Sequence, residues 1–347
     1  MKRRKYLLTV GVLGSSVVSG CVGANATHDS TAEFVANGNL DAESESIDEE
    51  TGFSDDGRND NADEELEETD AIVGELVEGE NMSLVVEDVE RDVDLGEFAS
   101  PDADNEFVSV SVALKNTSDE FLSVSNLLQT RIRDDEEYSY PQTLFADDEP
   151  TFNDGQFAPG ELERGAINFE LPEDATGLEL VWDFELAFFT ELDRAVVDLE
   201  EETTVHTLEQ DLRTDIHDVG TAIEFEETDA TVNDVRIEES LGLLAEPEAG
   251  NEYVIVDISV ENQTGEEQWV STILQMIVKD EDGYSYSEDF VASVELSQRF
   301  DEGTPLADGE TRRGEIVYQV EEDLSPLYWV FEFSLWTDGD KTFWQIQ

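Results

Sequence analysis

The chain repeats itself at an offset of 146 residues. Tyr138-Ser139-Tyr140 recurs as Tyr284-Ser285-Tyr286, and Asn116 recurs as Asn262. A register held over this length predicts a tandem duplication of a domain of about 115 residues, not a short solenoid repeat. The same register holds at Val73-Gly74 and Val219-Gly220, at Asp88-Val89 and Asp234-Val235, at Leu95-Gly96 and Leu241-Gly242, and, after a three-residue insertion, at Arg164-Gly165 and Arg313-Gly314.

Each copy has the alternating pattern of half-buried strands. Apolar residues occupy every second position in "NEFVSVSVALKN" and again in "NEYVIVDISVEN", which is the period of a strand with one buried face. Asp282-Gly283 and Asp338-Gly339 each lie between apolar runs and predict hairpin turns. The residues expected on buried faces are Val108, Val110, Val112 and Leu114 in the first copy, and Val254, Val256, Ile258 and Val260 in the second.

The predicted fold is all-β, with two tandem immunoglobulin-like antiparallel β-sandwiches after a disordered acidic spacer. Seven or so short strands in about 115 residues favour a sandwich. The chain has one cysteine, so it lacks the Cys…Trp…Cys pattern of antibody domains. Apolar stripes near the end of each copy are interpreted as core and not as a ligand site. They comprise Leu178, Leu180, Trp182, Phe184 and Leu186, and Leu327, Trp329, Phe331, Phe333 and Leu335.

The first twenty residues have the pattern of an export signal. Four basic residues (2–5) precede an uncharged stretch from Tyr6 to Gly20, which is shorter than the roughly 20 residues that span a bilayer. Adjacent Arg3 and Arg4, followed by Tyr6-Leu7-Leu8, resemble a twin-arginine signal. We therefore expect residues 1–20 to direct export.

The single cysteine lies directly after this stretch. Val18-Ser19-Gly20-Cys21 resembles a lipobox, in which the sulfur receives a diacylglyceryl group and the chain is cut before the cysteine. Cys21 is the predicted lipid attachment site, and two acyl chains give stable anchoring. The predicted location is extracytoplasmic, on the outer face of the cell membrane. The alternative is a cysteine that falls by chance in the apolar region of the signal.

A strongly acidic segment follows. From Asp41 to Asp70 there are 15 acidic residues against one base, Arg58, and such a stretch stays extended and disordered. We interpret it as a tether, with a binding tail for a basic partner as the alternative. The predicted layout is a signal at 1–20, a tether at 21–71, a first domain at 72–198, a linker at 199–218 with a candidate short helix from Thr207 to Asp215, and a second domain at 219–347.

The overall charge of the chain argues against functions that require binding to other polyanions. The chain has 88 acidic and 18 basic residues, a formal net charge of −70, and is still 39% hydrophobic. This composition resembles that of proteins from extreme halophiles, where concentrated salt screens self-repulsion. It excludes nucleic-acid binding, which depends on Lys and Arg at phosphates, and it opposes adsorption on anionic lipid.

Candidate sites are few, and no catalytic constellation, cofactor motif or metal site is predicted. Acidic turns at 134–137 and 280–282 offer oxygen ligands for Ca²⁺, but they lack the twelve-residue calcium loop, so solvated hairpins are the favoured interpretation. His28, His206 and His217 lie in the tether and the linker without cysteine partners. Four asparagines occupy glycosylation sequons, with strand-ending Asx turns as the alternative at the equivalent pair Asn116 and Asn262. The candidate acceptors are Asn25, Asn81, Asn116 and Asn262.

The repeats resemble a widespread bacterial and archaeal family of unknown function. The resemblance rests on "FVSVSVALKNTSDE" and "YVIVDISVENQTGEE", each followed by an acidic hairpin, and on "APGELERG" and "LADGETRRG". It covers roughly residues 73–186 and 219–335. It implies secreted or lipid-anchored proteins with an immunoglobulin-like domain, related to an immunoprotective extracellular antigen fold, and it supplies no catalytic residues.

The sequence therefore predicts a lipid-anchored surface protein of halophilic archaeal type that is not an enzyme. Its expected role is non-catalytic binding or adhesion at the cell envelope, and its expected partners are the membrane and an unidentified envelope protein or ligand. The alternative is an accessory solute- or metal-binding lipoprotein that serves a transporter. A deep apolar pocket would favour the alternative, and flat charged faces would favour protein contacts.

Overall fold

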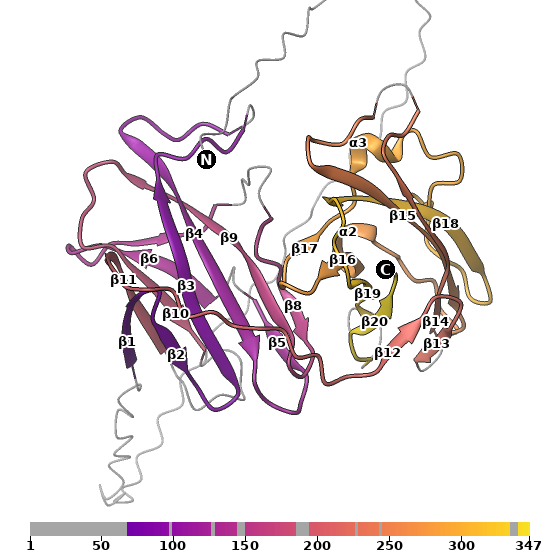
Figure 1. Ribbon diagram of the computed structural model, residues 1–347, viewed down its shortest axis with the longest axis horizontal. Coiled ribbons are helices and arrows are strands. Elements are labelled where there is room, and N and C mark those ends of the chain that lie inside the picture. The colour runs from indigo at the N-terminus through magenta and orange to yellow at the C-terminus, as the bar shows by residue number, and fades with distance from the viewer. Residues whose placement is uncertain are drawn as a thin grey trace, which may run out of the picture. The chain divides into compact units, whose positions relative to one another are not determined.

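The computed structural model describes residues 68–96, 99–125, 129–143, 150–184, 194–225, 228–242, 245–333 and 339–347. The predicted export signal, Cys21 and most of the tether lie outside these residues. The described residues belong to one compact unit, which contains both repeats (Figure 1). No helix in the described ranges has the length and apolar character to cross a bilayer.

The first repeat folds as two facing sheets. One sheet has the order β2-β3-β4-β9, the other has the order β1-β11-β10-β6-β7, and β5 and β8 form a separate small pair. The strands are β1 (Glu68–Val73), β2 (Leu76–Glu78), β3 (Met82–Arg91), β4 (Asn105–Asn116), β5 (Leu122–Val124), β6 (Thr130–Arg133), β7 (Ser139–Pro141), β8 (Gly155–Phe157), β9 (Leu162–Pro172), β10 (Glu179–Asp183) and β11 (Arg194–Glu202).

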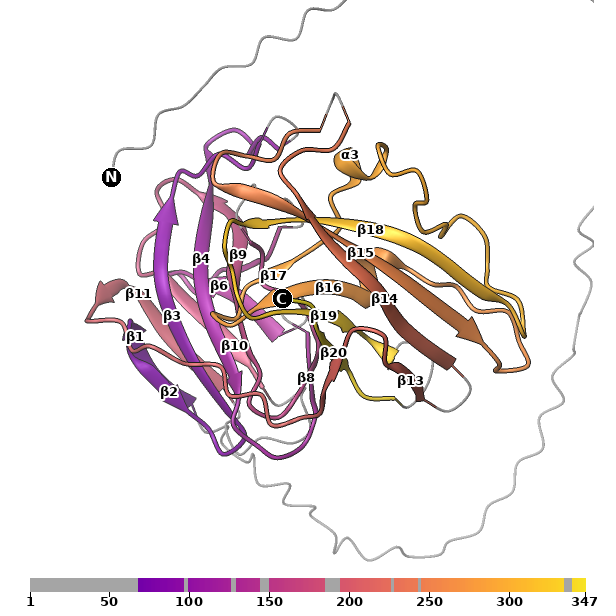
Figure 2. The same ribbon diagram turned by 45° about the vertical axis from the view of Figure 1, so that its right-hand side comes forward.

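The second repeat builds the same sandwich. Its sheets have the orders β13-β14-β15-β18 and β12-β20-β19-β16-β17, so each of its strands has a counterpart in the first repeat (Figure 2). Two single helical turns, α2 (Thr272–Gln275) and α3 (Phe290–Ser293), lie in its connections. The strands are β12 (Ile216–Asp218), β13 (Ala222–Phe225), β14 (Thr228–Glu238), β15 (Asn251–Asn262), β16 (Met276–Asp280), β17 (Ser285–Tyr286), β18 (Thr311–Glu321), β19 (Leu327–Phe331) and β20 (Thr342–Gln345).

The sequence match between the repeats extends to backbone irregularities. The register of β3 on β4 shifts between Val86 and Asp88, and that of β14 on β15 shifts between Val232 and Asp234. These positions differ by the same 146 residues as the sequence repeat. Such a shift is typical of a β-bulge, which adds one residue to a strand, so β3 and β14 carry the same irregularity at the same place in the repeat.

A glycine switches the chain between sheets at the start of each repeat. Gly74 and Gly220 have φ values of +88° and +90°, which favour glycine. Their N–H groups donate to Val86 O and Val232 O at 2.8 Å and 2.7 Å. The strand before each glycine joins the opposite sheet and pairs in parallel with the last strand of that sheet. The predicted all-β fold of two tandem antiparallel sandwiches is confirmed, and within it this one strand pair in each repeat is parallel, because the first and last strands enter the sheet in the same direction.

The predicted core stripes are buried in both sandwiches. The alternating residues of β4 and β15 are at most 1% exposed, and Trp182 and Trp329 are fully buried. Trp329 Nε1 donates to Tyr318 Oη at 3.0 Å, so the second core satisfies its buried indole. Leu186 and Leu335 lie outside the described residues. Buried members of the late stripes are Leu178, Leu180, Trp182, Phe184, Leu327, Trp329, Phe331 and Phe333.

The connection between the sandwiches differs from the predicted linker. β11 continues to Glu202, and the candidate helix from Thr207 to Asp215 does not form. Residues 203–213 run extended because their backbone groups bond to the first sandwich and not to each other. Thr203 N donates to Val73 O, and Asp211 N donates to Gly160 O, at 2.8 Å and 2.9 Å.

Candidate functional site

The acidic turns are closed by their own first aspartate. Asp134 Oδ1 accepts from the N–H groups of Glu136 and Tyr138 at 3.0 Å and 2.9 Å, and its Oδ2 accepts from Tyr140 Oη at 2.7 Å. In the second repeat Asp280 accepts from Tyr284 N at 2.9 Å and from Tyr286 Oη at 2.8 Å. The repeated Tyr-Ser-Tyr motif thus marks a hairpin whose turn is closed by hydrogen bonds to its first aspartate.

The aspartates that close the two turns differ in the direction of their pKa shifts. Desolvation raises the pKa of Asp134, but the bonds from Tyr140 and the backbone outweigh it and the pKa is lowered. Burial and the same bond raise the pKa of Tyr140 to about 12. At Asp280 burial dominates and raises the pKa. Within the described ranges no group of three or more His, Cys, Asp or Glu side chains is placed to hold a metal ion.

The equivalent sequon asparagines close the turns after β4 and β15. Asn116 and Asn262 are fully buried. Asn116 Nδ2 donates to Glu120 O at 2.7 Å and Phe157 O at 2.9 Å, and its Oδ1 accepts from Ser118. Asn262 makes the corresponding bonds. The geometry favours the Asx-turn interpretation, because both amide hydrogens are used inside the folded domain.

The remaining predicted site residues are not brought together. Asn81 is half-buried directly before β3, and its main-chain carbonyl oxygen accepts from Thr117 N at 2.8 Å. His206 lies in the connection, and His217 packs 5.9 Å from Trp344 between ring centroids. Arg3, Arg4, Cys21, Asn25 and His28 lie outside the described residues, so the lipid, signal and first sequon predictions stay predictions.

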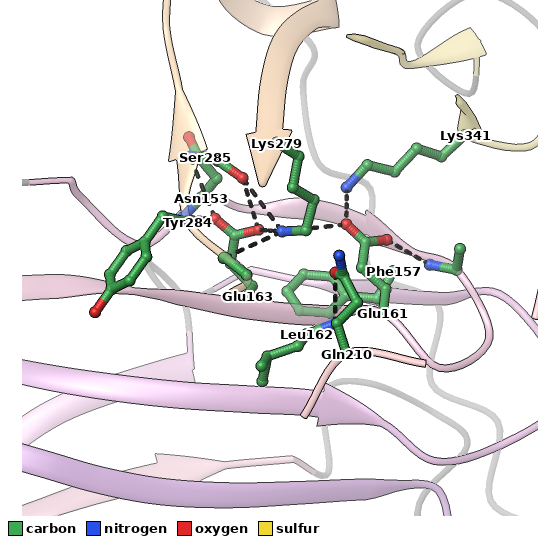
Figure 3. Close-up of polar contacts among 12 residues, drawn as sticks. Asn153, Phe157, Glu161, Leu162, Glu163, Gln210, Lys279, Tyr284, Ser285 and Lys341 are labelled. Atoms are coloured by element: carbon green, nitrogen blue, oxygen red, sulfur yellow. Dashed lines mark hydrogen bonds and ion pairs between the residues drawn. The ribbon is translucent and has the colours of Figure 1, made fainter. Parts of the chain in front are cut away.

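A buried junction joins the two sandwiches, and sequence analysis did not identify it. The hairpin formed by β16 and β17 packs against β9 of the first repeat (Figure 3). Arg164 N donates to Gly283 O at 2.8 Å. Gly283 has φ +93°, and a Cβ atom there would lie 2.8 Å from Leu162 Cγ. Glycine is thus required both by the turn and by the close approach.

Lys279 is the centre of the junction (Figure 3). It is completely buried and forms an ion pair with Glu163 of the other sandwich, while Glu161 Oε1 lies 3.6 Å from its Nζ. Ser285 Oγ donates to Glu163 Oε2 at 2.9 Å. Because Glu161 and Glu163 are also buried, each carboxylate depends on a cation from the second repeat.

Lys341 supplies the second cation. Its Nζ lies 2.6 Å from Glu161 Oε1 and within 6 Å of the ring centroids of Phe157 and Phe343. Burial alone would lower the pKa of Lys341, but Glu161 and neighbouring carboxylates outweigh it and raise the pKa above 10.5. The resulting stabilisation is complete below pH 10.5 and is lost only as pH rises through the higher folded value. Each of the two lysines thus faces a carboxylate of the first repeat, as a buried charge requires, and the buried Glu332 also acts on Lys341.

The connecting segment closes the junction from the side. Arg164 donates to Leu208 O at 2.7 Å and pairs with Glu87 at 3.0 Å, and it also bonds to Asp282 O. Gln210 Nε2 donates to Asp280 O at 2.9 Å. The connection is therefore part of the interface between the two sandwiches.

Three of the five lysines of the chain lie at the junction or contact the segment that connects the two sandwiches. The chain has five lysines, of which Lys2 and Lys5 belong to the predicted signal. The other three are Lys279, Lys341 and Lys115, and Lys115 Nζ donates to Glu209 O of the connecting segment at 2.7 Å. Lys279 and Lys341 each pair with a buried glutamate of the first repeat, which fixes the positions of these side chains. The rarity of lysine was the available sequence signal.

A second feature is a group of exposed apolar side chains on and beside α2 and α3 of the second sandwich, which we call the apolar patch. Of eleven large hydrophobic side chains exposed in the described residues, six lie on or beside α2 and α3. Clustered exposed apolar side chains commonly mark interaction sites, whereas scattered ones do not. The patch comprises Trp269 (62% exposed), Ile273 (54%), Leu274 (69%), Phe290 (45%), Val291 (75%) and Val294 (74%).

Buried polar contacts hold the two helical turns of the patch together. Thr272 of α2 bonds to Glu288, which precedes α3, and its N–H donates to Glu302 at 2.9 Å. Glu288 also pairs with Arg299 at 3.1 Å, and Arg299 lies 5.9 Å from the Phe290 ring centroid. Side-chain caps from Ser271 and Asp289 begin the two turns. The apolar side chains are thus presented by an ordered frame.

Comparison with solved structures finds similarity to proteins of low sequence identity, one of which is described as a β-sandwich protein. An uncharacterised β-sandwich protein from Clostridium difficile is 18% identical, with 40% of this chain and 100% of that chain covered and a TM-score of 0.27. A putative lipoprotein from Bacillus subtilis is 16% identical, with coverages of 36% and 39% and a TM-score of 0.31. A secreted protein from Mycobacterium tuberculosis is 13% identical, with coverages of 38% and 96% and a TM-score of 0.28. No curated protein matches the chain.

The family comparison matches both sandwiches. A domain of unknown function, DUF4352, matches residues 71–191 and again residues 217–341. The two matches coincide with the repeats derived from the sequence and with the two sandwiches of the structure. The chain therefore belongs to the DUF4352 family, of which it carries two copies in tandem.

Proposed function

We propose that this protein is a lipid-anchored protein of the outer cell surface that binds a partner at the envelope without catalysis. The observation that carries the proposal is the apolar patch, which offers a contact surface on a domain whose described residues bring no catalytic group together. The junction supports it, because a binding domain held by buried charges keeps a fixed geometry relative to its neighbour. The lipobox-like sequence ending at Cys21 supports the anchoring.

Replacing the predicted lipid attachment residue tests the anchoring. In the native host, we expect wild-type protein in the membrane fraction and the Cys21→Ser variant in the culture medium, because removal of the sulfur removes both acyl chains. Quantitative immunoblots of the two fractions measure the shift. A Ser30→Ala variant, changed in the tether, should fractionate like wild type. Equal fractionation of Cys21→Ser and wild type would contradict lipid anchoring.

A further inference from the structure

We infer that the apolar patch binds a protein segment whose apolar side chains are flanked by lysine or arginine. This inference rests on the proposed binding function and names its surface and the chemistry of its partner. The centre of the patch is suited to a protein contact, because interface cores are rich in aromatic and aliphatic side chains and poor in charge. Trp269, with 62% of its surface exposed, is the residue type most often found to dominate binding energy.

The rim of the patch determines the charge of the partner. Glu266 and Glu267 precede Trp269 and are exposed, and Glu295 follows Val294 and is exposed. Arg299 is the nearby cation, and it is already paired with the buried Glu288. The rim is therefore net negative, so a basic partner complements it, whereas an acidic partner meets like charges at contact distance.

The same charge argues against two other occupants. A second copy of this chain would bring an acidic rim against an acidic rim, in a protein of net charge −70. An anionic lipid surface would repel the rim in the same way. Concentrated salt shortens the range of this repulsion to about 3 Å near 1 M. Charges in direct contact still favour a basic partner over an acidic one.

Two synthetic peptides test the inference against the full mature chain carrying Cys21→Ser, in about 2 M NaCl. Both peptides have the core Leu-Trp-Leu-Leu; one is flanked by three lysines at each end and the other by three glutamates. Fluorescence anisotropy of labelled peptide measures binding. We expect the lysine-flanked peptide to bind at least tenfold more tightly than the glutamate-flanked one.

Matched variants locate the binding site. Leu274→Ser combined with Val291→Ser should weaken binding of the lysine-flanked peptide at least tenfold. Ile237→Ser, at a 43% exposed apolar position on β14 of the same sandwich, should leave binding unchanged. If the Leu274→Ser/Val291→Ser variant and the Ile237→Ser variant bind the lysine-flanked peptide equally well, the inference is overturned. A preference of the protein for the glutamate-flanked peptide would overturn it as well.

Two further measurements test the other occupants. Sedimentation that shows dimers lost in the Leu274→Ser/Val291→Ser variant would assign the patch to a second copy. Co-pelleting with phosphatidylglycerol vesicles, lost in the same variant, would assign it to lipid. Either result overturns the inference of a basic protein partner.

Binding to whole cells that lack the native protein separates this inference from the proposed function. If wild type and the Leu274→Ser/Val291→Ser variant bind such cells equally, envelope binding stands and the patch is not its site. If neither binds, the binding function itself fails. Loss of cell binding only in the patch variant supports both.

Discussion

Replacing Lys279 with methionine is expected to cost about 3–5 kcal/mol of unfolding free energy, the range found when one partner of a buried ion pair is removed. Methionine keeps most of the side-chain volume but removes the cation between Glu163 and Glu161. Those carboxylates would then stay buried with an unbalanced charge, or the junction would open and admit water. If the junction opens, the loss of unfolding free energy equals the free energy that couples the two sandwiches.

Calorimetry in about 2 M NaCl distinguishes these outcomes. A buried unbalanced charge lowers the melting temperature of one joint transition, and an opened junction splits the transition into two. Lys115→Met is the matched control, because Lys115 donates to a single carbonyl, that of Glu209, and its loss should cost about 1 kcal/mol or less. Equal effects of the two substitutions would show that the buried cluster does not hold the sandwiches together.

The second large expected effect is loss of folded structure at low salt. Eleven of the thirteen basic side chains in the described residues already form ion pairs with neighbouring acids. Few cations therefore remain to offset the excess of 88 acidic over 18 basic residues. At about 0.01 M salt the Debye length of ~30 Å lets this charge repel itself across a whole domain, and near 1 M it falls to ~3 Å.

Thermal melting followed by circular dichroism tests this. We expect the melting temperature to rise steadily from about 0.05 M to 2 M NaCl, with β structure reduced at the low end. KCl at equal ionic strength should give the same curve, because screening depends on ionic strength and not on the identity of the cation. A melting temperature independent of salt would contradict the proposed adaptation to concentrated salt.

Most of the fold could be predicted because the duplication provides the same pattern twice. Alternation in β4 and β15 fixes which residues face the core, and the repeated Val-Gly pairs mark the corner at Gly74 and Gly220. The parallel pairing of β1 with β11 could not be predicted, because it joins strands from opposite ends of a domain. The candidate helix from Thr207 to Asp215 failed because tertiary hydrogen bonds outweigh local helix propensity.

The junction could not be predicted because it depends on positions where the repeats differ. Lys279 replaces Arg133, which pairs within its own sandwich with Glu179 at 2.7 Å. Gly283 replaces Glu137, and Glu163 corresponds to Arg312. Matching positions reveal a shared fold, whereas a contact between two copies uses one surface of each and so selects for differences. The apolar patch could not be predicted, because the sequence does not distinguish an exposed apolar residue from a buried one.

The buried charges are expected to join the two sandwiches into one cooperative unit of unfolding. Scanning calorimetry of the full mature wild-type chain in about 2 M NaCl measures whether the two unfold together. We predict a single transition whose calorimetric enthalpy equals its van't Hoff enthalpy. Two resolved transitions, or a calorimetric enthalpy about twice the van't Hoff value, would contradict this, because they would show that the sandwiches unfold independently.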